Sequence, residues 1–234
     1  MKNILFTLTL FVSLVNYSQN VDEIIDKINN QKNYQSAIND LNQLIKQDAT
    51  VPYNYYLRAF SYNKLKNFFN AKKDYLKSIE LGYVSDGAYG DLAGIYFFEK
   101  DWNNAAVYYK KQLDELGGDN IFAHYNIAVS HKNSGAYTLA NQYFTNVISI
   151  NTDEELVADA YFARGKSKNI LSDKSGCSDL MKSVDLQISA LYDKKNWARN
   201  GSRVDYLYNS YCVNRKIYKL YGKQFKSALK AFYK

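Results

Sequence analysis

The sequence predicts an all-α solenoid of stacked antiparallel helix pairs. Apolar residues follow helical periodicity in segments of about a dozen residues, separated by polar breaks. A single proline among 234 residues favours helices joined by short turns. Small residues also return at spacings of 34, 34, 35 and 36 residues, at Ala37, Ala71, Ala105, Ala140 and Gly176. Such a period is the sequence signature of a repeat architecture.

Two further series keep the same phase and explain why the helices pair. A second set of small residues precedes the first by about a dozen positions and comprises Ala59, Ala93, Ala128 and Gly165. Small side chains allow two helix axes to approach closely, and large apolar residues fill the space beside them. One pair cannot bury its apolar face alone, so the pairs are expected to stack into a solenoid.

These positions resemble the tetratricopeptide repeat. The resemblance covers about residues 18–187, and the best copies are Tyr55–Leu81, Tyr89–Leu113 and His124–Ile150. It implies a right-handed superhelix of about five repeats with a C-terminal helical cap. The proline that the family carries near the end of each repeat is missing here. The first and fifth copies are degenerate, which is typical of terminal repeats.

The N-terminus predicts a secretory signal peptide over residues 1–19. Lys2 precedes an apolar run from Ile4 to Val15, and Tyr17-Ser18-Gln19 is a plausible cleavage region. The run is shorter than the roughly 20 residues that a spanning helix needs. We therefore expect export to the periplasm or the secreted space, a repeat domain over residues 20–187 and a cap over residues 188–234.

The cap contains most of the excess positive charge. Of the 30 Lys/Arg and 23 Asp/Glu in the chain, residues 190–234 contain 11 and 2, and this segment is also rich in tyrosine. A basic helical face can contact an acidic polymer or anionic lipid headgroups, or it can simply be the solvated side of a capping helix. Nucleic acid is not an expected partner, because an exported protein seldom meets it.

The resemblance implies a concave groove, lined by the first helix of each pair. The second, fifth, ninth and twelfth positions of those helices point into it. The aromatic and polar candidates for contact with a partner are Tyr53, Tyr56, Phe60, Phe97, Phe122, Tyr125, Asn126 and Phe162. The carboxylate clamp found in some relatives is not expected, because only Asn126 matches it.

Three glycines, Gly87, Gly90 and Gly94, share one face of a predicted groove helix. Each costs about 1 kcal/mol relative to alanine in a helix interior. One explanation is a bare floor that lets the backbone of a ligand approach. The other is internal: the glycines make room for bulky neighbours such as Tyr56 or Tyr125.

The two cysteines, Cys177 and Cys212, are similar in placement to a pair in exported bacterial repeat proteins. That resemblance implies a disulfide between the last repeat and the closing helix. The alternative is two buried free thiols.

No motif indicates catalysis, a metal or a cofactor. His124 and His131 are seven residues apart, whereas two histidines that bind zinc from one helix are typically four apart. Both occupy repeat positions that hold tyrosine in other copies. The predicted function is a non-catalytic adaptor of the cell envelope or secreted space that binds a protein or peptide segment in the aromatic groove. The alternative is a surface-associated module that docks on membrane or an acidic polymer through its basic C-terminal helix. The identity of the partner and the oligomeric state are left open.

Overall fold

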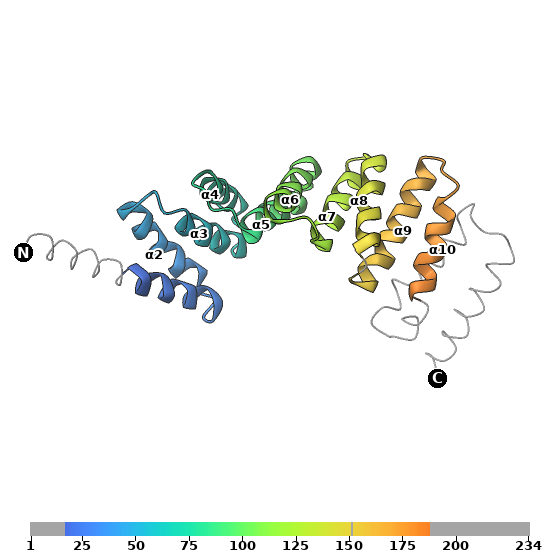
Figure 1. Ribbon diagram of the computed structural model, residues 1–234. Helices are drawn as coiled ribbons and strands as arrows, with labels where there is room; N and C mark the ends of the chain where they lie inside the picture. Colours follow the sequence, from blue (N-terminus) through green and yellow to red (C-terminus); the bar gives the residue numbers. More distant parts are fainter. Residues whose placement is uncertain (1–16, 151, 188–234) are drawn as a thin grey trace, which may run out of the picture. The chain divides into compact units, whose positions relative to one another are not determined.

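The computed structural model describes residues 17–150 and 152–187, all of whose regular elements are helices (Figure 1). The described residues divide into two compact units, the first ending at residue 99 and the second beginning at residue 100. Within each unit, every helix packs on the next one along the chain. None of the helices in the described ranges combines the length and apolar character needed to cross a membrane.

The first unit is helical over residues 17–29 and then forms four further helices. Val21, Ile24 and Ile28 of the first segment are buried together with Ala37 and Leu41, so this segment belongs to the core of the unit. The four helices that follow are α2 (Tyr34–Gln47), α3 (Pro52–Lys64), α4 (Phe68–Glu80) and α5 (Asp86–Phe98). The single proline is the first residue of α3, where its missing N–H breaks no helical hydrogen bond.

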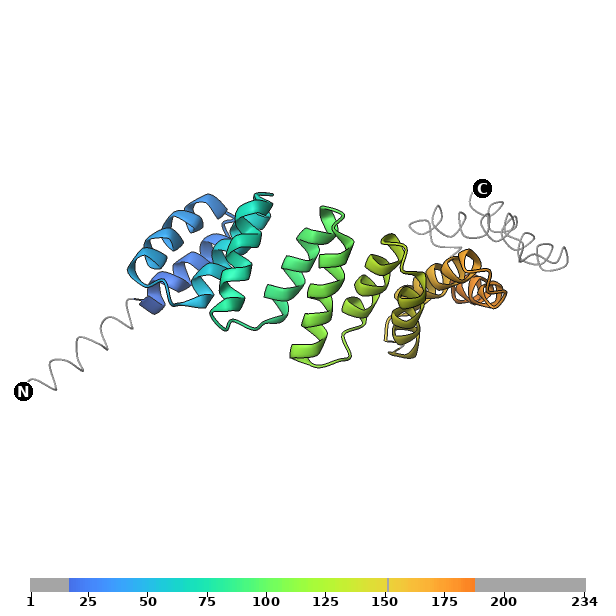
Figure 2. The ribbon, with the colours of Figure 1, turned by 90° about the horizontal axis from the view of Figure 1, so that it is seen from above.

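The described part of the second unit, up to residue 187, contains five helices. They lie side by side in chain order (Figure 2). Its core is built around Ala128, Ala140, Phe144, Val157 and Ala160, all of which are buried. The helices are α6 (Trp102–Leu116), α7 (Ile121–Asn133), α8 (Tyr137–Ile150), α9 (Glu154–Ile170) and α10 (Gly176–Gln187).

The turn between the two helices of a pair has one construction throughout the described residues. It contains a residue in the left-handed conformation, with φ between 51° and 84°. At the α3–α4 turn, Asn67 N–H donates to the carbonyl of Tyr62 over 2.9 Å, and Lys66 N–H donates to that of Asn63 over 2.9 Å. The Asn67 side chain then accepts from Asn70 N–H and caps α4. The left-handed residues are Lys32, Lys66, Lys100, Gly135 and Ser172.

Lys66 is strained by this turn, because a side chain disfavours the left-handed conformation. We expect Lys66→Gly to stabilise the chain by up to about 1 kcal/mol. Lys174→Gly is the matched control, since Lys174 is exposed in a turn but has no positive φ, and it should lose a few tenths of a kcal/mol. Urea denaturation measures the free energy of unfolding of both variants. Equal changes for Lys66→Gly and Lys174→Gly would show that Lys66 is not strained.

The small-residue series predicted from the sequence is confirmed in its physical role. All five members from Ala37 to Gly176, and all four from Ala59 to Gly165, are buried. The helices α9 and α10 approach each other closely. A Cβ built on Gly165 would lie 2.7 Å from Leu180 Cγ and 2.8 Å from the carbonyl oxygen of Gly176. These two helices therefore meet with a glycine on each side.

Candidate functional site

In the first unit, the predicted groove residues Tyr53 and Tyr56 lie on α3 and belong to a cluster of tyrosine rings. The centroids of Tyr53 and Tyr83 are 5.4 Å apart, and those of Tyr56 and Tyr83 are 5.0 Å apart. Tyr56 also contacts the ring of Tyr75, which is fully buried and donates its hydroxyl to Asp91 over 3.0 Å. Burial raises the pKa of Tyr53 and raises that of Tyr75 strongly. The cluster is therefore a packed and partly dehydrated structure.

The glycine face of α5 receives one of these tyrosines. A Cβ at Gly87 would lie 2.5 Å from the hydroxyl oxygen of Tyr56 and 3.3 Å from Cζ of the same ring. At this position the space freed by glycine is taken by the side chain of the chain itself, which favours the internal explanation for Gly87. Gly90 and Gly94 are half-buried further along α5.

The other two predicted groove residues of this unit differ in what surrounds them. Phe60 is half-buried on α3, and the ammonium of Lys64 lies 4.8 Å from its ring centroid. Phe97 is half-buried near the end of α5.

In the second unit, two predicted groove residues come together at a pocket of about 550 Å³. Tyr125 from α7 and Phe162 from α9 lie on its wall, so the first helices of consecutive pairs both contribute. The ring of Tyr125 packs edge-on against buried Phe144, with centroids 5.9 Å apart, which anchors it. The described residues lining the pocket are Tyr125, Lys132, Asn133, Tyr137, Asp159, Phe162, Ala163, Lys166, Ser167 and Ile170.

The pocket combines apolar walls with charge. Lys132 and Lys166 contribute two ammonium groups and Asp159 one carboxylate. The Lys166 ammonium lies 5.5 Å from the ring centroid of Phe162. Burial lowers the pKa of Lys132, and the charge of Lys166 lowers it further. Among the described residues Lys132 has no ion-pair partner. An aromatic pocket with a dehydrated cation is suited to an anionic group attached to an apolar one.

Two predicted residues lie near this pocket but do not line it. Phe122, in the first turn of α7, is 59% exposed. Asn126 is half-buried, and its backbone carbonyl accepts a hydrogen bond of 2.7 Å from the Ser130 hydroxyl. Both remain candidates for contact with a longer partner segment that extends beyond the pocket.

The sequence interpretation missed the charged members of the pocket, although the signal was present. In the repeat register that places Tyr125 and Phe162 at the fifth position, Lys132 is at the twelfth position, Asp159 at the second and Lys166 at the ninth. These are inward positions by the register that selected Tyr125 and Phe162. Choosing chiefly aromatic residues at those positions left the lysines out.

Other charged residues form internal ion pairs. Arg58 on α3 donates through Nε and Nη2 to both oxygens of Asp74 on α4, over 2.6 and 2.8 Å, and through Nη1 to Asn42 on α2. Its guanidinium lies 5.5 Å from the ring centroid of Tyr55. One arginine thus connects three successive helices.

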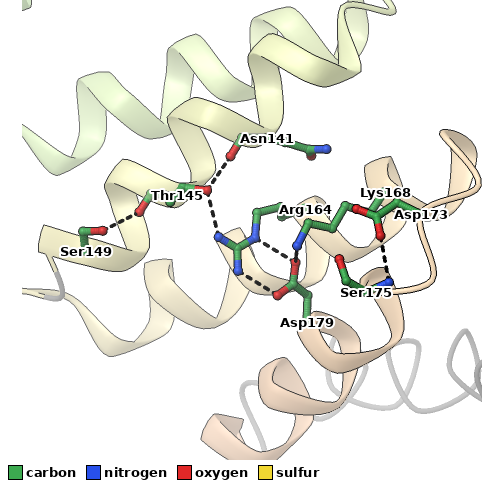
Figure 3. A network of polar contacts seen from close by, with 8 residues as sticks. All are labelled: Asn141, Thr145, Ser149, Arg164, Lys168, Asp173, Ser175 and Asp179. Atoms are coloured by element: carbon green, nitrogen blue, oxygen red, sulfur yellow. Dashed lines mark hydrogen bonds and ion pairs between the residues drawn. The ribbon is translucent and has the colours of Figure 1, made fainter.

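The same arrangement recurs in the second unit (Figure 3). Arg164 on α9 binds both carboxylate oxygens of Asp179 on α10 over 2.7 Å and donates to the Thr145 hydroxyl on α8 over 2.8 Å. Lys168 also contacts Asp179, at 2.9 Å. Because these groups satisfy one another, we assign the cluster to helix packing.

The two histidines pack against an aromatic ring. Tyr143 has its ring centroid 5.9 Å from that of His124 and 5.7 Å from that of His131. Nε2 of His124 is 2.9 Å from the carbonyl oxygen of Gly118, and burial lowers the pKa of His131. Within the described ranges no group of His, Cys, Asp or Glu side chains is arranged to hold a metal ion.

The predicted disulfide involves one residue outside the described ranges. Cys177 lies half-buried in the first turn of α10. Cys212 falls among residues 188–234, together with the rest of the predicted cap. The pairing therefore stays a prediction.

Known proteins share the repeat and the fold of this chain. The family model of the tetratricopeptide repeat matches residues 52–81, which span α3 and α4. No curated protein matches the sequence.

Solved structures match over most of the chain. YrrB, described as a TPR protein with an unusual peptide-binding site, has a TM-score of 0.64 at 16% identity, over 76% of this chain and 92% of YrrB. A MamA protein has a TM-score of 0.65 at 16% identity, over 76% and 94% of the two chains. MamA from Desulfovibrio magneticus RS-1 has 0.62 at 12% identity, over 74% and 95%. At these identities the likeness concerns the fold: the chain has the fold of tetratricopeptide-repeat proteins, and its residues 52–81 match that repeat.

Proposed function

We propose that this protein is a non-catalytic adaptor that binds a segment of another protein, and that the pocket between α7 and α9 is part of its binding groove. The observation that carries the proposal is the meeting of Tyr125 and Phe162 at one pocket of about 550 Å³. That volume is within the range of about 300–1,000 Å³ that is typical of ligand pockets. The tetratricopeptide fold, which generally serves protein–protein interaction, and the likeness to YrrB support it.

Two finer elements of the proposal rest on the sequence. The N-terminal pattern of Lys2, the apolar run and a polar cleavage region supports export to the periplasm or secreted space. In an oxidising compartment Cys177 and Cys212 are proposed to form a disulfide.

Tyr125→Ala is expected to weaken partner capture at least about tenfold, because aromatic residues at the centre of an interface are the commonest hot spots. The measurement is affinity capture with the labelled full chain from an extract of the cells that make it, read by mass spectrometry. Leu139→Ala is the control, since Leu139 is an exposed apolar residue that lies outside this pocket. It should capture as the unaltered chain does.

The salt dependence of capture separates the proposal from its alternative. A partner retained at high salt and lost with Tyr125→Ala supports the groove. Release by salt, with Tyr125→Ala behaving like the control, would instead favour docking through the basic segment 188–234. Phe162→Ala, on the opposite helix of the pocket, should lose capture as Tyr125→Ala does. Thermal unfolding of both variants shows whether the loss reflects binding or folding.

A further inference from the structure

The charges of the pocket between α7 and α9 narrow the kind of segment that fits it. Among the described residues that line it, two carry an ammonium group and one carries a carboxylate, which is an excess of one positive charge. Lys132 is half-buried, and the like charge of Lys166 acts on it. A cation in that position is destabilised by lost hydration and by repulsion, and both costs fall when an anion binds beside it.

The walls of the pocket require an apolar group as well. Ile170 is 57% exposed at its rim, and Phe162 and Tyr137 present ring surface to it. Lys166 lies across the ring of Phe162 and so keeps its charge close to apolar surface. A ligand that is only charged would leave this apolar area in water. A ligand that is only apolar would add no counter-charge to Lys132, which has no ion-pair partner among residues 17–150 and 152–187.

Resting on the proposed function, we propose that the occupant of this pocket is a partner peptide in which one acidic residue stands beside an apolar one. The acidic side chain reaches Lys132 and Lys166, and the apolar side chain covers Phe162 and Ile170. Asp159 disfavours a peptide with several consecutive acidic residues, because its carboxylate would repel theirs in a partly dehydrated site. The basic segment 190–234 of the chain itself, with 11 Lys/Arg against 2 Asp/Glu, has the wrong charge for this pocket.

The test is selection from a random peptide display library on the immobilised full chain. Recovered peptides should be enriched in an acidic residue next to an apolar one. The best peptide should bind roughly five- to tenfold more tightly than its counterpart with glutamine or asparagine in place of the acid, because a hydrogen bond to a charged group is stronger than a neutral one.

Variants assign the effect to the pocket. Lys132→Gln should remove most of the preference for the acidic peptide, and Lys132→Arg should retain it because the charge remains. Asp159→Asn should bind the acidic peptide several-fold more tightly. Lys174→Gln removes the same charge from an exposed turn outside the pocket and should change the affinity less than twofold.

The contrary outcomes are distinguishable from a failure of the proposed function. Enriched peptides that lack acidic residues but lose affinity with Tyr125→Ala would overturn the charge preference and leave the groove standing. An equal loss of affinity for the acidic peptide with Lys132→Gln and Lys174→Gln would show that the preference comes from general surface charge. It would overturn the assignment to this pocket. No enrichment from any form of the chain would contradict both proposals.

Discussion

Gly165→Ala is expected to destabilise the chain by about 2 kcal/mol. Alanine gains about 1 kcal/mol in helix propensity, but its Cβ would lie 2.8 Å from the carbonyl oxygen of Gly176 and 3.0 Å from the amide nitrogen of Leu180. Both are backbone atoms of α10, so the clash can be relieved only by moving that helix. Overpacking of this kind typically costs about 1–3 kcal/mol, occasionally more, and we expect the upper part of that range.

Urea denaturation measures the loss, and hydrogen exchange of the α10 amides locates it. Gly118→Ala is the control, because a Cβ there would meet no atom within 4 Å and Gly118 has no positive φ. It should be neutral or slightly stabilising. If Gly165→Ala were as harmless as the control, α9 and α10 would not meet through their glycines.

Asp179→Ala is expected to cost about 3 kcal/mol or more. The side chains of Asp179 and Arg164 are only 8% and 13% exposed, and the carboxylate accepts two hydrogen bonds from the guanidinium and contacts Lys168. Its removal leaves two positive charges on a largely buried face of α9. Breaking a buried pair from one side costs about 3–5 kcal/mol, because the remaining charge is uncompensated.

The same substitution in an exposed pair is the matched control. Asp114 pairs with Lys110 across one turn of α6, and the two side chains are 57% and 54% exposed. Asp114→Ala should therefore cost no more than about 0.5 kcal/mol. Equal losses for Asp179→Ala and Asp114→Ala in urea denaturation would show that solvent screens the Arg164 pair as well.

The fold was predictable from the sequence because its signal is repeated. The small residues at the helix contacts recur at the same phase in nearly all copies, so a chance alanine such as Ala136 is separated from Ala140 by its phase. The turns were predictable for a related reason, since Asn33, Asn67 and Asp101 stand at one position of the period and cap the helices that follow.

The site was less predictable, because its features occur only once. The period indicates which positions face inward, and two of the residues at those positions, Tyr125 and Phe162, line one pocket. The period does not indicate which side chain fills the space above a glycine. Only the structure shows that the side chain of Tyr56 lies against Gly87. The pairing of Arg164 with Asp179 was likewise not predictable. The two residues are fifteen positions apart in sequence, and they meet only because α9 and α10 pack against each other.

The central claim is that another protein binds at the pocket between α7 and α9, and photo-cross-linking inside cells tests it most directly. A photoreactive amino acid replaces Phe162 in one variant and Leu139 in another, and the cross-linked segments are identified by mass spectrometry. We expect position 162 to cross-link a defined segment of another protein, with an acidic residue beside an apolar one, and position 139 not to. Cross-links from both positions to the same mixture of abundant proteins, or none from position 162, would contradict the claim.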